Sequence, residues 1–129
     1  MQSSAIGGNG VTILVVDYDA LITLNTSDQL AELGYVPLEA FSAAEALALL
    51  EKQPGIAAMI TDYSMPGMNG VDLAKAARAI RPNLPILLAT GYADLPDDAP
   101  SDLPRLEKPF REDELAHQIE IILKLVSAE

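Results

Sequence analysis

The chain has 129 residues, with eight basic and nineteen acidic side chains, a formal charge of −11 and no cysteine. This length fits one globular domain, the acidic balance disfavours phosphate backbones and anionic lipid as direct partners, and the lack of cysteine excludes disulfide frameworks and thiolate metal sites. Its apolar runs are too short to span a bilayer and it opens with no export signal, so we expect a soluble cytoplasmic domain with neither nucleic acid nor a membrane as partner.

The first regular pattern follows a polar tail. Residues 1–10 are rich in Gly, Ser and Asn, which predicts a disordered tail before a domain spanning residues 11–127. Thr12–Val16 is a continuous aliphatic and β-branched run, typical of a strand buried on both faces. A helix then begins after Asp19, a potential cap, and stops at Gly34. This helix carries four leucines, at positions Leu21, Leu24, Leu30 and Leu33.

A second strand and helix come next. Val36–Glu39 is a short apolar segment that predicts a strand. Ser42, with Glu45 three residues later, forms a capping box, and the helix that it begins ends before Pro54. Ile56–Thr61 is a third apolar run. The order of elements up to this point is therefore strand, helix, strand, helix, strand.

The remaining elements continue this alternation. Ser64–Gly70 is rich in Pro and Gly and predicts a loop, and Val71–Ile80 has helical periodicity. Pro85–Ala89 predicts the fourth strand and Arg105–Glu107 a short fifth one. Glu112–Ser127 predicts a last helix. The expected core positions of this helix are Leu115, Ile119, Ile122, Leu123 and Val126.

Alternating strands and helices predict the fold class. Each strand–helix–strand unit is right-handed, so the chain should build an α/β, doubly wound, five-stranded parallel sheet covered on both faces. In such sheets the ligand-binding crevice lies outside the carboxyl ends of the strands. The residues that follow the strands are therefore the candidates for function.

Polar and charged side chains stand at these strand ends. They are Asp17 and Asp19 after the first strand, Asp62 after the third, Thr90 after the fourth and Lys108 after the fifth. Converging carboxylates need a cation, and oxygen ligands alone favour Mg²⁺. A lysine and a hydroxyl beside the ion suit a transferring phosphoryl group. An aspartate can itself be the nucleophile and form an acyl phosphate.

Four segments of the chain resemble one known family. They are ILVVD at Ile13–Asp17, ITDYSMPGMNG at Ile60–Gly70, LLATGYAD at Leu87–Asp94 and EKPF at Glu107–Phe110. From residue 11 to residue 126 the chain is similar to the receiver domains of bacterial two-component response regulators. The resemblance implies a flavodoxin-like (βα)5 receiver fold. The Ala-Thr-Gly-Tyr segment resembles a subgroup found as stand-alone receivers and as receiver modules of hybrid histidine kinases.

The resemblance also implies a role for each site residue. Asp62 matches the phosphoacceptor, and Asp17 matches part of an acidic Mg²⁺ pocket to which Ser64 adds its backbone carbonyl. Thr90 matches the hydroxyl that binds the phosphoryl group, and Lys108 the cation that pairs with it. The phosphoryl donor would be a phosphohistidine of a histidine kinase or of a histidine phosphotransfer protein. The output would be protein–protein contact, with no catalysis beyond the domain's own phosphorylation and dephosphorylation.

Two residues depart from the family pattern. The family usually has a second acid directly after the first, as a metal ligand, but this chain has Tyr18 there. Either Asp19 or water takes that ligand's place, or the metal site is weakened. The family also usually has an aromatic residue three positions before the lysine, where this chain has Arg105. A guanidinium cannot retreat into an apolar slot, so we expect no Thr–aromatic switch, and Arg105 would engage an acid or the phosphoryl group.

Prolines predict two further features. Asp94–Pro104 contains three prolines among four aspartates, and an interior proline costs a helix about 3 kcal/mol. The fourth helix of the family should therefore be shortened or replaced by a Pro-rich loop. The resemblance also implies a cis peptide bond before Pro109, since cis bonds are tolerable only before proline.

Two other functions are also compatible with the sequence. One is a pseudo-receiver that only docks to partners, which Tyr18 favours if metal binding is impaired. The other is an aspartate-nucleophile phosphohydrolase, with Asp17 as nucleophile and Asp19 as acid and base. In that class an acidic pair follows the lysine, whereas the Asp97–Asp98 pair of this chain precedes Lys108.

Overall fold

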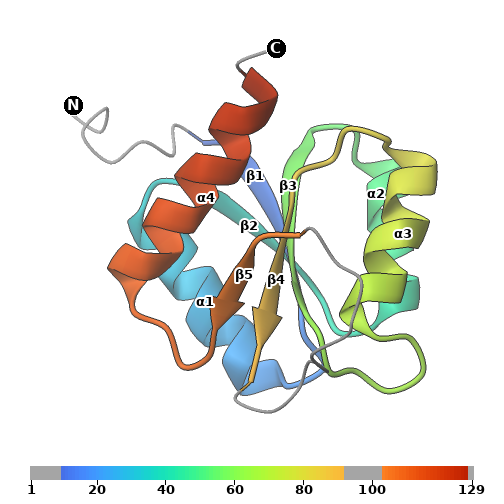
Figure 1. Ribbon diagram of the computed structural model, residues 1–129, viewed down its shortest axis with the longest axis horizontal. Coiled ribbons are helices and arrows are strands. Elements are labelled where there is room, and N and C mark those ends of the chain that lie inside the picture. The colour runs from blue at the N-terminus through green and yellow to red at the C-terminus, as the bar shows by residue number, and fades with distance from the viewer. Residues whose placement is uncertain (1–9, 92–102, 128–129) are drawn as a thin grey trace.

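Strands and helices alternate in the computed structural model, which describes residues 10–91 and 103–127 (Figure 1). The strands are β1 (Thr12–Val16), β2 (Val36–Ala40), β3 (Ile56–Asp62), β4 (Ile86–Thr90) and β5 (Arg105–Glu107). The helices in the described part are α1 (Ala20–Glu32), α2 (Ala43–Lys52), α3 (Gly70–Ile80) and α4 (Glu112–Ser127). These bounds agree with the predicted elements to within a residue or two, including the three-residue fifth strand.

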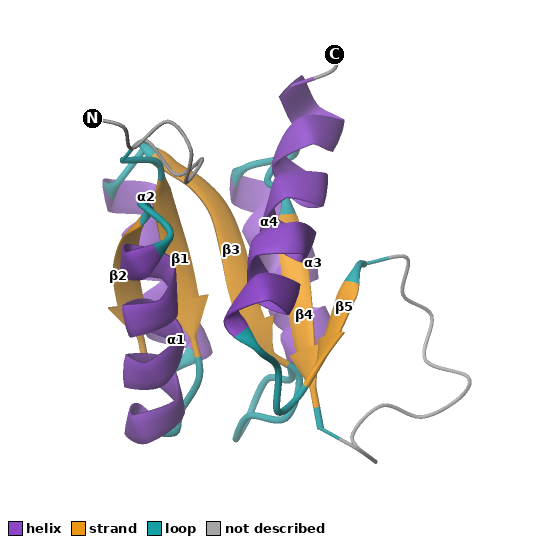
Figure 2. Cartoon of the chain, turned by 90° about the vertical axis from the view of Figure 1, so that its left-hand side faces the viewer, coloured by secondary structure: helices purple, strands orange, loops and turns teal. Residues whose placement is uncertain are grey.

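The five strands form one parallel sheet in the order β2-β1-β3-β4-β5. The chain moves outward from β1 to β2 and then returns past β1 to β3, so the direction of winding reverses between β1 and β3. All strand arrows point the same way in Figure 2. The carboxyl ends of the strands therefore share one edge, and the predicted doubly wound α/β fold is confirmed.

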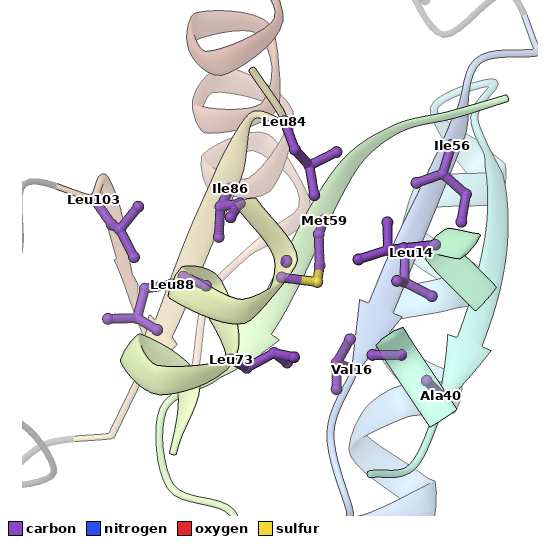
Figure 3. Close-up of a cluster of buried hydrophobic side chains, with 14 residues drawn as sticks. Leu14, Val16, Ala40, Ile56, Met59, Leu73, Leu84, Ile86, Leu88 and Leu103 are labelled. Atoms are coloured by element: carbon purple, nitrogen blue, oxygen red, sulfur yellow. The ribbon is translucent and has the colours of Figure 1, made fainter. Parts of the chain in front are cut away.

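Helices cover both faces of the sheet: α1 and α4 pack on one face, α2 and α3 on the other (Figure 1). Along β1 the side chains alternate between two buried clusters, with Leu14 and Val16 in one and Ile13 and Val15 in the other. Figure 3 shows the cluster on the α2 and α3 face. Burying one aliphatic side chain of this kind stabilises the fold by about 1.5–3 kcal/mol. The clusters on both faces therefore stabilise the packing of the helices on the sheet.

Helix α1 buries a different face from the one its leucines suggest. Leu30 is buried, but Leu21 is 77% exposed and Leu24 is 52% exposed. The residues that α1 turns inward with Leu30 are Thr23, Thr26 and Ser27. A hydroxyl is accepted in a buried position when it finds an acceptor, and the Thr23 hydroxyl lies 2.9 Å from the backbone carbonyl oxygens of Asp17 and Asp19.

The predicted helix boundaries rest on local contacts. Ser42 caps α2 by accepting a hydrogen bond from the backbone N–H of Glu45, at 3.1 Å. The Glu45 carboxylate accepts in return from the backbone N–H of Phe41, at 2.8 Å. After α1 the chain turns at Gly34, whose φ of 93° is a conformation that favours glycine. The predicted glycine stop is present, and Ser42 and Glu45 cap α2 as a pair, with the return bond at Phe41, one residue before the cap.

Two predictions fall mainly outside the described residues. The tail of residues 1–10 is described only at Gly10, and the expected Pro-rich loop at Asp94–Pro104 only at Leu103 and Pro104. Leu103 is buried in the cluster on the α2 and α3 face. Within the described ranges, none of the helices has the length and apolar character that crossing a membrane requires.

Candidate functional site

The carboxyl edge of the sheet collects four of the predicted site residues. Asp62 and Thr90 end β3 and β4, while Asp17 and Lys108 directly follow β1 and β5. Strand register aligns them, since Asp62 pairs with Ala89 next to Thr90 in the ladder. Asp17, Asp62 and Thr90 are all buried, at 5%, 4% and 7% exposure.

Lys108 joins the two buried carboxylates. Its Nζ donates to Oδ1 of Asp62 at 2.8 Å and lies 3.6 Å from Oδ2 of Asp17. The lysine side chain is only partly buried, so its charge is shared between the carboxylates and solvent. The three ionised groups carry a net charge of about −1 by simple addition, and the site therefore still favours an added cation.

The pKa of Asp17 reports the same imbalance. Burial raises this pKa above its ordinary value, and the nearby charge of Asp62 raises it further. A hydrogen bond from the backbone N–H of Asp19 and the charge of Lys108 act in the opposite direction. Burial and the charge of Asp62 therefore outweigh the contacts that stabilise the charged form of Asp17.

A hard divalent cation fits these donors. Asp17 and Asp62 offer buried carboxylate oxygens, and the chain continues from Asp62 to Ser64, whose backbone carbonyl is the third predicted ligand. Mg²⁺ prefers oxygen ligands, is often held by one or two carboxylates and keeps several waters. Asp17, directly after β1, and Asp62, at the end of β3, therefore offer the kind of ligands with which proteins hold Mg²⁺.

Backbone contacts position Asp62 and Lys108 relative to β4. The backbone N–H of Lys108 donates to the carbonyl of Thr90 at 2.7 Å, and that of Tyr63 donates to the carbonyl of Ala89 at 2.9 Å. The first contact ties the lysine to the end of β4, and the second ties the residue after Asp62 to the same strand. A displacement of Thr90 would therefore also move the backbone of Lys108.

Gly70 lets α3 begin directly against the site. A Cβ atom at this position would lie 2.6 Å from the carbonyl oxygen of Asp62 and 2.7 Å from the Leu88 side chain. Real side chains do not approach so closely, so only glycine fits without a shift of the helix or of β3. Its own N–H donates to the carbonyl of Tyr63 at 2.8 Å.

The Asp19 carboxylate is engaged at the start of α1. Its Oδ1 accepts from the backbone N–H groups of Leu21 and Ile22, at 3.0 and 3.3 Å, so Asp19 is the N-cap that its position predicts. Tyr18, beside it, is 57% exposed. In the described ranges of the chain, no group of three His, Cys, Asp or Glu side chains is arranged to hold a metal. The structure thus brings Asp17 and Asp62 together but directs the Asp19 side chain elsewhere.

The remaining predicted residues are Arg105, Pro109 and Ser64. Arg105 is exposed on β5, opposite Leu88 in the strand pairing. The peptide bond between Lys108 and Pro109 is cis. Ser64 is exposed in the loop between β3 and α3. The engagement of Arg105 with an acid or a phosphoryl group therefore stays a prediction.

Sequence reasoning missed two residues that shape the site. Thr23 holds the segment between β1 and α1 through its hydroxyl, and Gly70 clears the space behind Asp62. A spacing signal existed for Thr23, because Thr23, Thr26 and Leu30 share one helical face. Gly70 was visible only as the last residue of a Gly-rich loop.

Comparisons with known proteins point to one family. The family model described as the response regulator receiver domain matches residues 13–120. The response regulator receiver protein CpdR of Brucella abortus is 38% identical over 98 residues, covering 73% of this chain and 81% of that protein. A chemotaxis protein CheY homolog of Campylobacter jejuni is 32% identical over 124 residues, covering 91% and 95%. A response regulator receiver domain protein from Clostridium thermocellum has a structure with a TM-score of 0.84, 27% identity and coverage of 92% and 98%.

Proposed function

Because the chain belongs to the family of response regulator receiver domains, we propose that it accepts a phosphoryl group on Asp62 from a phosphohistidine, with Mg²⁺. The donor would be a histidine kinase or a histidine phosphotransfer protein, and the output would be protein contact. The observation that carries this proposal is the buried Asp62 carboxylate, 2.8 Å from the Lys108 amine at the carboxyl edge of the sheet.

The residues of the site divide the chemistry among them. A carboxylate oxygen of Asp62 would attack the phosphorus, so that an O–P bond forms while the N–P bond of the phosphohistidine breaks and the electron pair returns to the imidazole. The Lys108 amine would pair with the phosphoryl oxygens as negative charge spreads over them. Asp17, Asp62 and the Ser64 carbonyl would hold Mg²⁺, which neutralises phosphoryl charge when bound.

Thr90 would couple phosphorylation of Asp62 to the conformation of the surrounding loops. Its hydroxyl stands at the end of β4, and its carbonyl accepts the backbone N–H of Lys108 at 2.7 Å. A hydrogen bond from the hydroxyl to the phosphoryl group would pull on Thr90 and on the segment that begins at Lys108. Phosphorylation would then shift the population of two loop conformations.

An apolar surface beside the site could receive the donor protein. Leu21 and Leu24 of α1 are exposed to solvent, and Leu21 also lines a cavity of about 370 Å³ at the same end of the sheet. The cavity is lined by Leu21, Ile22, Asn25, Thr26, Lys108, Pro109 and Phe110. Because Lys108 lies both on the cavity wall and against Asp62, a protein docked here would have its histidine near the acceptor.

Binding of beryllofluoride, which mimics an acyl phosphate on a carboxylate, tests this function. We expect the wild-type protein to change its tyrosine fluorescence saturably with beryllofluoride when Mg²⁺ is present, since Tyr63 directly follows the acceptor. Asp62→Ala should show no change. Equal responses of the two proteins would refute the assignment of Asp62, and a saturable wild-type response without Mg²⁺ would refute the metal requirement.

One alternative is favoured by Tyr18. A docking module without phosphorylation chemistry would tolerate a tyrosine where the family carries a metal ligand. In that case neither beryllofluoride nor acetyl phosphate would produce an Asp62-dependent change. The phosphohydrolase alternative is disfavoured, because its acid and base, Asp19, already accepts two hydrogen bonds from the N-terminus of α1.

A further inference from the structure

We propose that Asp19 organises the divalent-cation site without ligating the ion, so that Asp17 and Asp62 are the carboxylates that bind it, beside the Ser64 backbone carbonyl, and water fills the remaining positions. This inference rests on the proposed function, because it concerns the same site. It assigns Asp19 a positioning role through two contacts, one made by its side chain and the other by its backbone.

The first contact occupies the Asp19 side chain. Its Oδ1 accepts from the N–H groups of Leu21 and Ile22, which have no partner within the helix because they lie in its first turn. The carboxylate also interacts favourably with the positive end of the helix dipole. Rotation toward a metal ion would give up both hydrogen bonds and leave two N–H groups to solvent.

The second contact orients Asp17. The backbone N–H of Asp19 donates to Oδ1 of Asp17 at 2.9 Å, and the other oxygen, Oδ2, faces Lys108 at 3.6 Å. The Thr23 hydroxyl lies 2.9 Å from the carbonyl oxygens of both aspartates and holds this turn in place. The direction of the Asp17 carboxylate is therefore set by the backbone of residue 19 and does not depend on the charge there.

Solvent exposure also distinguishes Asp19 from Asp17 and Asp62. Asp17 and Asp62 are buried, where a charge acts strongly on its neighbours, whereas Asp19 is exposed and its charge is weakened by water. Among residues 10–91 and 103–127, no three acidic or histidine side chains form a metal-binding group. The charge of Asp19 should consequently add little to the binding of a dication.

Mn²⁺ binding, followed by the electron paramagnetic resonance signal of the free ion, tests this inference. In Asp19→Asn the cap oxygen and the backbone N–H remain while the charge is removed, and we expect the Mn²⁺ dissociation constant to stay within about twofold of wild type. In Asp17→Asn, a matched removal of one buried carboxylate charge, we expect a loss of about tenfold or more. Asp19→Ser, a second uncharged cap, should behave as Asp19→Asn does.

The outcomes decide between a positioning role and a ligand role. A tenfold or greater loss in a folded Asp19→Asn or Asp19→Ser protein would overturn the inference, and either variant suffices if the other does not fold. Failure of wild type to bind Mn²⁺ saturably at millimolar concentration would also overturn it. Phosphorylation of Asp62 by acetyl phosphate is measured separately, so its absence alongside normal Mn²⁺ binding would contradict the proposed function alone.

Discussion

Lys108 shows how much one side chain does at this site. Two aspartates buried side by side repel each other, and the cost of burying them falls only if a cation is near. Lys108 supplies that cation directly after β5, the shortest of the described strands, through contacts of 2.8 Å to Asp62 and 3.6 Å to Asp17. Its role as a phosphoryl partner and its role in stability are therefore expected to be linked.

Replacing Lys108 by alanine should destabilise the fold. The substitution leaves the carboxylates of Asp17 and Asp62 without their shared partner, and we expect the free energy of unfolding at neutral pH to fall by about 1–3 kcal/mol. Lys75→Ala, on the exposed face of α3, is the matched control and should change it by less than about 0.5 kcal/mol. Urea unfolding measures both, and equal losses would show that the buried cluster does not need its cation.

Helices α1 and α3 define the site from opposite faces of the sheet. Helix α3 starts at Gly70, against the backbone of Asp62, while α1 starts at its cap Asp19 and turns hydroxyls inward and leucines outward. Periodicity could not show the orientation of α1, because Leu21 and Leu24 form as regular a helical pattern as Thr23, Thr26 and Ser27 do. The Thr23 hydroxyl, 2.9 Å from two backbone carbonyl oxygens, distinguishes the two faces, and these carbonyls are positioned only in the folded chain.

The start of α3 should not tolerate a methyl group. Gly70→Ala brings a Cβ atom within 2.6 Å of the Asp62 carbonyl oxygen, so we expect a loss of about 1–3 kcal/mol in the free energy of unfolding. At Gly55 an added Cβ meets nothing within 4 Å, and Gly55→Ala should be close to neutral. Chemical denaturation compares the two variants. A Gly70→Ala protein as stable as Gly55→Ala would mean that α3 can move away from β3 at no cost.

The outward leucines of α1 should matter for the donor protein alone. We expect the double variant Leu21→Ala and Leu24→Ala to keep its unfolding free energy within about 1 kcal/mol and its Asp62-dependent phosphorylation by acetyl phosphate. Phosphotransfer from a phosphohistidine protein should slow about tenfold or more, because contact area beside Lys108 is lost. Leu30→Ala, from the buried face, should instead destabilise the fold by about 2–5 kcal/mol. If the double variant slowed acetyl phosphate equally, the surface would not be specific to the donor.

At the scale of the whole molecule, the topology of the parallel sheet brings the site residues together. The βα alternation and the residues at the strand ends were enough to predict the fold, the carboxyl edge and the meeting of Asp17 with Asp62, because parallel strands end together. Sequence left open whether Asp19 is a ligand, since a residue after a strand can face either the site or the next helix. It also gave no signal for the space that Gly70 leaves free, which depends on how closely α3 approaches β3.

Burial of Tyr35 makes the free energy of unfolding depend on pH. Desolvation raises the pKa of Tyr35, and the charge of Glu120 on α4 raises it further. The folded chain therefore holds the Tyr35 phenol proton more tightly than the unfolded chain does. The contribution of neutral Tyr35 to the free energy of unfolding is fully present below about pH 10 and is lost as the pH rises through the raised pKa. Between about pH 9 and pH 11, wild type should lose more unfolding free energy than Tyr35→Phe does. Parallel losses in the two proteins would contradict this assignment.

If Asp62 accepts the phosphoryl group, trapping the acyl phosphate will locate it at this residue. The protein is phosphorylated with acetyl phosphate and Mg²⁺, then reduced with borohydride, which converts a phosphorylated aspartate into homoserine that peptide mass spectrometry can locate. We predict homoserine at position 62 and none in Asp62→Ala. Homoserine at position 17, or none at all in the phosphorylated wild type, would contradict the assignment.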